Sequence, residues 1–174
     1  MNTKYQLGVG MIEVLVSLVL LSIAVLGFSA LQFRALDAMQ EASDRTVAMS
    51  LARDLAERIR VNRTQLVEYK TKINGSSSGE PKACKVADSS ATTISTTPMC
   101  NRAEMVSYDV SQVLGAARQA GMKLVIDRCQ GGDRECVYIA WGNTIISATN
   151  VSACMSDGVY VAGATCLVME AYGT

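Results

Sequence analysis

The sequence predicts an α+β protein in which one long N-terminal helix, half in a membrane and half outside it, packs on a small antiparallel sheet with disulfides. Three observations predict this class. Residues 14–31 form an apolar run without a single charge. Residues 32–62 contain neither proline nor glycine, and their apolar side chains recur at three- and four-residue steps. All six cysteines lie between Cys84 and Cys166, outside this helical first third.

The chain begins with a short polar leader that carries one basic residue, Lys4, and runs up to Gly8. Five residues beyond this glycine lies a lone carboxylate, Glu13, at the edge of the apolar run. A glutamate inside a membrane segment costs roughly 2.5–3.5 kcal/mol on insertion scales, so it is by default a candidate functional residue.

Two simpler interpretations of this segment remain open. An ordinary secretory signal peptide could be cleaved after Ala24, because Ser22 and Ala24 form a small-x-small site. That interpretation places Glu13 inside a hydrophobic region that should be uncharged. A plain signal anchor explains the apolar run, but it leaves Gly8 and Glu13 without a role.

The helix should continue beyond the membrane. As a helix, residues 14–31 span about 27 Å, close to a hydrocarbon core of roughly 30 Å. We expect one helix from about Gly10 to about Arg60, roughly 75 Å long at the same rise. One half should pack on its own domain, and the other half should insert into lipid or contact other copies.

After Asn62 the composition changes. Residues 70–80 and 88–98 are rich in Ser, Thr, Gly and Lys, which predicts loops. Residues 108–119 have helical spacing and end at Gly121, so they predict a second, short helix. Strands are predicted at 123–129, 136–141 and 166–172, with a glycine-containing hairpin loop at 130–135 and a possible strand within 158–163.

The even number of cysteines, confined to one region, indicates a disulfide framework in an oxidising compartment. Six cysteines allow 15 pairings. Proximity within local loops favours pairing of neighbours: Cys84 with Cys100, Cys129 with Cys136, and Cys154 with Cys166. A metal site would need CxxC spacing and histidine, and the sequence has neither.

Charge and composition argue against several classes of function. The formal net charge is +0, whereas nucleic-acid binding is usually marked by a basic patch. Arg118, Lys123, Arg128 and Arg134 could cluster, but a solvated face is the better interpretation. The chain has no histidine, no P-loop and no GxSxG motif, so we expect neither an enzyme nor a bound cofactor.

The segment VGMIEVLVSLVLLSIAVLGFSALQ resembles the N-terminus of minor type IV pilins, most closely the PilV type. ARDLAERIRVNR, residues 52–63, is similar to the end of the long helix in that family. The resemblance implies a type IV pilin-like fold. It makes Gly8 the last leader residue, Val9 the N-methylated first residue of the mature chain, and Glu13 the assembly carboxylate that pairs with the amine of a neighbouring subunit.

Two features depart from the family pattern. The first mature residue is usually phenylalanine, and here it is Val9. Major pilins often have a proline in the membrane helix, whereas both prolines of this chain, Pro81 and Pro98, lie in predicted loops. The second departure argues for a minor subunit.

The resemblance also implies an organisation, a location and partners. We expect a prepilin leader at 1–8, a membrane and polymerisation segment at 9–31, a periplasmic helical segment at 32–62, and a disulfide-bonded head at 63–174. The subunit would sit in the bacterial inner membrane with its head in the periplasm, and then in the pilus at the cell surface. Its partners would be the prepilin peptidase and, through the long helix, other minor pilins and the major pilin.

The predicted function is that of a minor pilin, a structural subunit that helps to prime pilus assembly and is incorporated into the pilus or at its tip. One alternative is a minor pseudopilin of a type II secretion system, which is built from the same parts. Another is an adhesive or DNA-uptake component of the tip. The neutral charge gives no support to direct contact with nucleic acid.

Overall fold

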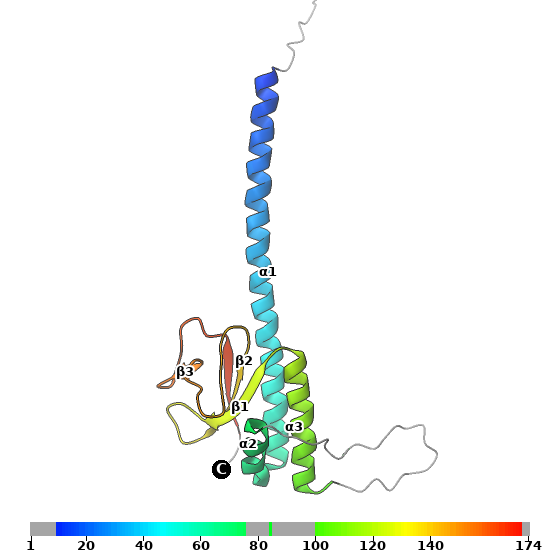
Figure 1. Ribbon diagram of the computed structural model, residues 1–174, viewed down its shortest axis with the longest axis vertical. Coiled ribbons are helices and arrows are strands. Elements are labelled where there is room, and N and C mark those ends of the chain that lie inside the picture. The colour runs from blue at the N-terminus through cyan, green and yellow to red at the C-terminus, as the bar shows by residue number, and fades with distance from the viewer. Residues whose placement is uncertain (1–9, 76–83, 85–99, 172–174) are drawn as a thin grey trace, which may run out of the picture. The chain divides into compact units, whose positions relative to one another are not determined.

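The computed structural model describes residues 10–75, residue 84 and residues 100–171. Figure 1 shows the order of the helices and strands along the chain. The chain divides into two compact units, Met1–Ser43 and Asp44–Thr174. The first contains the N-terminal part of the long helix α1 (Met11–Val61), and the second contains the rest of that helix with the remaining elements.

Helix α1 is present as one continuous element, as the sequence predicted. Within the first unit, none of its residues is buried. The helix is long and apolar enough to cross a membrane, a test that a signal sequence near an N-terminus also passes. The predicted boundary at residue 31 marks the end of the uncharged run, and it is a different boundary from the one between the two units, which follows Ser43.

Beyond Asp44, α1 is amphipathic and buries one stripe of small and aliphatic residues. The buried positions are Ala48, Ala52, Leu55, Ala56 and Ile59. They are separated by about one helical turn, so they share one face. Alanine at three of these positions allows the neighbouring elements to approach the helix backbone closely.

A helix replaces part of the loop that the sequence predicted for residues 70–80. After a short 3₁₀ turn η1 (Arg63–Gln65), helix α2 occupies Leu66–Asn74. The prediction was wrong because Tyr69 and Ile73 lie four residues apart on the same face and are both buried. Tertiary packing therefore overrides the polar composition of KTKIN. The predicted loop at 88–98 lies outside the described residues.

Helix α3 (Arg102–Gln119) begins six residues before the predicted start. Its N-terminus has a capping box: the Glu104 N–H donates to Asn101 Oδ1 at 2.9 Å, and the Asn101 N–H donates to Glu104 Oε2 at 2.9 Å. At the other end the chain leaves the helix at Gly121, where φ is +68°. Glycine adopts this left-handed conformation without steric cost, which explains the predicted stop.

The sheet has three antiparallel strands in the order β1 (Lys123–Arg128), β2 (Glu135–Ala140) and β5 (Cys166–Glu170). All three predicted strands are confirmed to within two residues at each end. In the register, Val125 lies opposite Tyr138, which in turn lies opposite Val168. The long N-terminal helix, the small antiparallel sheet and the disulfides confirm the predicted fold class.

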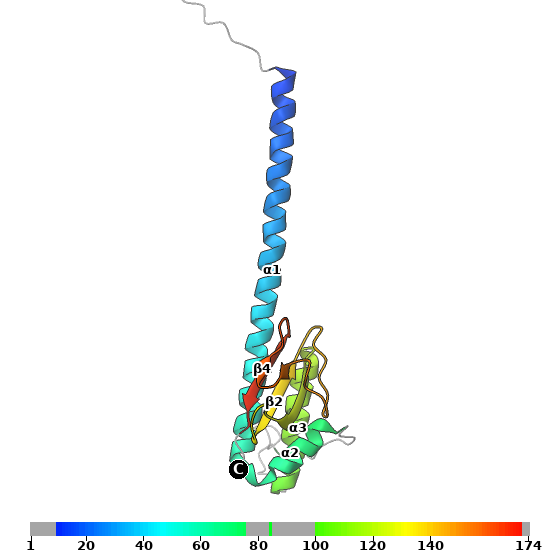
Figure 2. The same cartoon turned by 90° about the vertical axis from the view of Figure 1, so that its left-hand side faces the viewer.

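Both faces of the sheet are covered (Figure 2). One face packs with the helices, around Leu55, Ile59, Val110, Ile126 and Ile139. The opposite face carries Val125, Tyr138 and Ala140 and packs with the segment that follows β2, including Ile146 and Val151. Burial on both faces explains why β2 is buried over almost its whole length instead of alternating.

The possible strand within 158–163 is shorter than its sequence pattern indicated. Only β4 (Val159–Tyr160) forms, and it pairs with β3 (Met155–Ser156). The two are joined by Asp157 and Gly158, with φ of 51° and 80°, as a tight Asp-Gly hairpin turn requires. A Cβ on Gly131 would lie 3.5 Å from the Gly158 Cα, so this turn packs closely against the β1–β2 turn.

Three disulfides hold the second unit together. They join Cys84 to Cys100, Cys129 to Cys136, and Cys154 to Cys166. These are the partners that proximity in the sequence favoured. The second closes the β1–β2 hairpin, and the third ties the β3–β4 segment to β5. Short cross-linked loops limit the unfolded chain and help a small domain that has a small core.

Candidate functional site

Only one of the three residues predicted to act in processing and assembly lies within the described part of the chain. Gly8 and Val9 are outside it. Glu13 lies in the first turn of α1, with an exposed side chain. Its N–H donates to the Gly10 carbonyl at 3.0 Å, which begins the helix. Among the described residues, none donates a hydrogen bond to the Glu13 carboxylate, so this group requires a partner from elsewhere if it leaves water.

The surface around Glu13 is apolar on every side of the helix. Within residues 11–31 the exposed large side chains include Leu20, Leu26 and Phe28. Polar atoms are satisfied locally: the hydroxyls of Ser17 and Ser22 donate to the carbonyls four residues before them at 2.7 and 2.8 Å. This segment therefore offers lipid or another helix an apolar surface without unsatisfied hydroxyls.

Exposed apolar side chains continue past the uncharged run. Phe33, Leu36 and Met39 follow one another at three-residue steps, and each is more than half exposed. Asp37 and Glu41 belong to the same stretch, so the helix becomes amphipathic there. Among the described residues of the first unit, no element covers this apolar stripe. Its burial therefore requires a surface from outside these residues.

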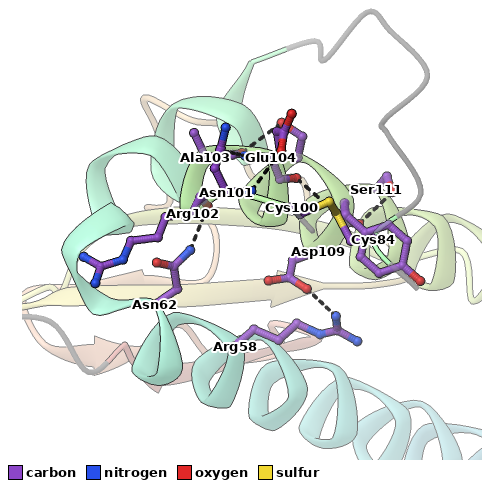
Figure 3. Close-up of a disulfide and its surroundings, with 12 residues drawn as sticks. Arg58, Asn62, Cys84, Cys100, Asn101, Arg102, Ala103, Glu104, Asp109 and Ser111 are labelled. Atoms are coloured by element: carbon purple, nitrogen blue, oxygen red, sulfur yellow. Dashed lines mark hydrogen bonds and ion pairs between the residues drawn. A yellow bond between two sulfur atoms is a disulfide. The ribbon is translucent and has the colours of Figure 1, made fainter. Parts of the chain in front are cut away.

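In the second unit, a buried polar cluster joins α1 to α2 and α3. Asp109 of α3 is 5% exposed. It accepts a hydrogen bond from the Arg58 guanidinium at 2.6 Å and another from the Tyr69 hydroxyl at 2.5 Å. Arg58 also pairs with Asp54 at 2.9 Å, on the exposed side. Figure 3 shows Arg58 and Asp109 pointing toward each other between α1 and α3.

The surroundings of this cluster keep the Tyr69 hydroxyl neutral and the Arg58 guanidinium charged. Burial and the hydrogen bond to Asp109 raise the pKa of the Tyr69 hydroxyl well above its ordinary value. Burial alone would lower the pKa of Arg58, but hydrogen bonds to Asp54 and Asp109 outweigh burial, and the net change is upward. A neutral phenol and a charged guanidinium therefore surround the carboxylate, and together they tie α1, α2 and α3 to one point.

A second polar contact lies at the far end of this helix junction. The side-chain amide of Asn62 donates to the Arg102 carbonyl at 2.9 Å, which joins the end of α1 to the start of α3 (Figure 3). The Cys84–Cys100 disulfide immediately precedes the Asn101 cap of the same helix. The N-terminus of α3 is thus fixed by a side-chain amide, a capping box and a covalent bond.

Sequence reasoning missed the Arg58–Asp109–Tyr69 cluster. A signal was present, because Asp109 falls among apolar positions that mark the buried face of α3: Val106, Val110 and Val113. A carboxylate on a buried helical face needs a partner. The sequence did not indicate which of the chain's cations would be that partner.

No arrangement suited to metal binding occurs among the described residues: no group of three or more Cys, Asp or Glu side chains is placed to hold an ion. Of the four cations that could cluster, Arg118 and Lys123 line the same cavity, between α2, α3 and β1. Arg134 pairs with Glu170, and Arg118 lies in the last turn of α3, where a positive charge complements the helix C-terminus.

Comparison with known proteins gives one match. A family model described as type IV pilin Tt1218 matches residues 30–111, which cover the second half of α1, α2 and the start of α3. No curated protein and no solved structure matches the chain. The match supports a type IV pilin, and the long helix, small sheet and disulfides are consistent with that fold. The apolar start of α1 fits a membrane-anchored pilus subunit. A structural family of this kind implies a non-enzymatic protein.

Proposed function

We propose that this chain is a minor type IV pilin of the PilV type, which is processed at Gly8, methylated at Val9 and helps to prime pilus assembly. One observation carries the proposal: a single helix has two parts with opposite environments. From Met11 to Ser43 no residue is buried, and from Asp44 onward the same helix forms part of a packed core. A structural subunit that polymerises through its N-terminus needs such a division.

The apolar surface of the first part is too long for a simple anchor. A segment of about 20 apolar residues is enough to span a bilayer. Here the exposed apolar side chains extend further, to Phe33, Leu36 and Met39, alongside charged residues. An amphipathic stripe directly after a membrane segment favours packing against other helices, because the polar side can face water while the apolar side is covered.

In this proposal, Glu13 makes the contact with a neighbouring subunit specific. An unpaired carboxylate in lipid is costly, and an opposite charge in a low-dielectric environment attracts it strongly. The free amine of a neighbouring, processed subunit is such a charge. Because the first unit offers Glu13 no partner among its described residues, docking onto a growing polymer relieves this cost.

A minor role is favoured over a major one by the absence of proline from residues 11–61.

Polymer formation by a single subunit type uses heterologous contacts that do not close, and these generate filaments. A priming subunit makes the same contacts with different neighbours. The prepilin peptidase, other minor pilins and the major pilin are therefore its proposed partners, in the bacterial inner membrane and then in the pilus.

Mass spectrometry of the N-terminal peptide tests the proposal. The chain is recovered from its native host in two fractions, sheared filaments and membranes. We expect a methylated peptide that begins at Val9 in the filament fraction. A peptide that begins at Val9 but occurs only in membranes would favour the pseudopilin of a type II secretion system or a subunit retained at the base. A peptide that begins at Val25 would contradict the proposal, since Ala24 would then end an ordinary signal peptide.

A substitution provides the matched control. Gly8→Leu should leave the leader attached and the subunit in the membrane, because Gly8 is the proposed determinant of cleavage. Gly10→Ala changes a glycine two residues away, where an added Cβ would lie in ordinary contact with the Ile12 side chain, at 3.8 Å. Processing should continue in this control. Equal processing of both variants would remove Gly8 from its proposed role.

A further inference from the structure

A cavity of about 220 Å³ lies between α2, α3 and the start of β1. Its lining includes Asn74 and Gly75 at the end of α2, Arg118 of α3, and Lys123 and Leu124 of β1. A cavity needs only about 10–15 Å³ to hold one water molecule. This cavity therefore has room for a polar group much larger than water.

The register of the sheet fixes which backbone groups of β1 face away from β2. The Cys129 N–H donates to the Arg134 carbonyl at 2.7 Å, so these two residues form a hydrogen-bonded pair. Such pairs alternate with non-bonded pairs along an antiparallel ladder. By this alternation, the N–H and C=O groups of Leu124 and Ile126 face the outer edge of β1.

At Ile126, a side chain of α2 fills this outer edge. The Ile126 N–H donates to Asn74 Oδ1 at 3.0 Å, and the Ile126 carbonyl accepts from Asn74 Nδ2 at 2.6 Å. One side-chain amide therefore makes the pair of hydrogen bonds that a residue of a neighbouring strand would make. It also limits the open stretch of the edge to the position of Leu124.

Leu124 presents the same two groups without a partner. Among the described residues, no hydrogen bond reaches its outward N–H or C=O. Leu124 is 2% exposed, so these groups meet the cavity that the residue lines instead of bulk water. A buried backbone group without a partner costs about as much as a lost hydrogen bond, and such groups are rare. The inner end of the cavity therefore suits a group that both donates and accepts.

Two cations give the cavity a positive outer end. Arg118 and Lys123 are both exposed, so the cavity reaches solvent beside them. Among the described contacts, neither pairs with a carboxylate, whereas Lys70 pairs with Glu135 at 2.9 Å. Two uncompensated cations that line one cavity favour an anion, and a guanidinium binds a carboxylate with two parallel hydrogen bonds.

We propose that this cavity binds an α-amido carboxylate, the group that an N-acylated amino acid or the last residue of a peptide carries. Its N–H donates to the Leu124 carbonyl, and its carboxylate accepts from the Leu124 N–H. The same carboxylate faces Lys123, which precedes Leu124 in the strand, and Arg118. Because Asn74 fills the next position of the edge, only one residue of the ligand pairs with β1. The inference does not depend on assembly into a pilus.

Titration of the full chain in detergent micelles with N-acetylalanine tests the site, and NMR follows the backbone amides. We expect a saturable shift of the Leu124 amide, because its N–H gains an acceptor. The Ile126 amide should change little, since Asn74 already holds it. If the Leu124 amide shows no saturable shift, the cavity holds only water and the inference is overturned.

Three matched ligands identify the groups that are recognised. N-acetylalaninamide lacks the carboxylate, and N-acetylproline keeps the carboxylate but lacks the N–H. Each should bind roughly tenfold more weakly than N-acetylalanine, because each loses a hydrogen bond to a buried partner. Inorganic phosphate reports binding by charge alone. Equal or tighter binding of N-acetylproline or phosphate would overturn the inference, since the Leu124 carbonyl would then play no part.

Peptide length distinguishes the two sources of the ligand. N-acetyl-trialanine carries the same last residue on a longer chain. Binding at least as tight as that of N-acetylalanine would support the carboxyl terminus of a peptide, and exclusion of the longer chain would support a small N-acylated amino acid. The N-terminal peptide that tests the proposed function is a separate measurement, so either proposal can fail alone.

Substitution of the two cations tests the outer end of the cavity. Arg118→Gln and Lys123→Gln should each weaken binding of N-acetylalanine by roughly fivefold, the upper range for an exposed ion pair. The fold should persist, because both side chains are exposed. Arg128→Gln is the matched control, since this exposed cation ends the same strand but does not line the cavity. An equal loss in the control, or no loss in either cavity variant, would overturn the inference.

Discussion

The two parts of α1 share one secondary structure and differ in what covers their apolar side chains. Before Ser43, apolar residues surround the helix as far as Leu31 and then share it with charged residues, and none is buried. After Asp44, they narrow to one stripe, and that stripe is buried in the core of the second unit. The difference teaches that helix formation and helix burial are separate properties. The first part leaves its apolar surface exposed, whereas the second part buries its apolar stripe within its own unit.

The largest expected effect concerns the uncovered part. Glu13→Ala removes the carboxylate that is proposed to pair with a neighbouring amine, so incorporation into filaments should fall by roughly tenfold, equivalent to about 1.4 kcal/mol. Membrane insertion should persist, because the substitution makes the segment more apolar. Quantitative detection of the chain in filament and membrane fractions measures both. Normal piliation in this variant would contradict the role assigned to Glu13.

A pair of leucines compares the two parts directly. Leu55 is 0% exposed and Leu26 is 70% exposed. Leu55→Ala should lower the free energy of unfolding of the head by about 2–5 kcal/mol, because it leaves a cavity in the core. Leu26→Ala should change it by less than about 0.5 kcal/mol. Denaturant unfolding of the full chain in micelles, followed by the fluorescence of the buried Trp141, distinguishes the two. Equal losses would mean that the first part also packs on the head.

The buried polar cluster around Asp109 should contribute less to the unfolding free energy than the buried apolar stripe of α1. Asp109→Asn keeps the shape of the side chain but removes the charge that faces Arg58, which should cost about 1–3 kcal/mol of unfolding free energy. Asp54→Asn changes the exposed partner of the same arginine and should cost less than about 1 kcal/mol. The same unfolding assay measures both variants. A larger loss for Asp54→Asn would show that the exposed pair, and not the buried one, holds Arg58.

The difference between the two parts of α1 could largely be predicted from the sequence, because the periodicity and charge of a helix indicate its environment. Residues 14–31 lack charge, and the stripe from Ala48 to Ile59 has helical spacing, so the extent of α1 followed. The three strands followed from runs of β-branched and aromatic residues. Proximity in short loops favoured the cysteine partners that the structure contains.

The remaining features depend on contacts between residues that are distant in the sequence. Helix α2 is stabilised by burial of Tyr69 and Ile73, which the polar composition around them conceals. The partners of Asp109 lie 51 and 40 residues away, and local pattern does not identify them. The same holds for Asn74 on the β1 edge, 52 residues from Ile126. Long-range polar pairing is a property of the folded chain.

The smallest expected effect is a pH dependence of the unfolding free energy that arises from the hydrogen bond between Tyr69 and Asp109. The pKa of Tyr69 is raised in the folded state above its ordinary value of 10.0, first by burial and then by the hydrogen bond to Asp109. A raised pKa means that the stabilisation is complete below pH 10.0 and is lost as the pH rises toward the folded-state pKa, since the unfolded chain ionises first. The unfolding free energy should therefore fall above pH 10.0, and Tyr69→Phe should remove part of that fall. Tyr108→Phe is the control, because this tyrosine directly precedes Asp109 in α3 but makes no side-chain hydrogen bond to it among the described contacts. Titration of tyrosinate absorbance gives the ionisation directly, and an alkaline fall that is the same in wild type and Tyr69→Phe would show that Tyr69 contributes nothing to it.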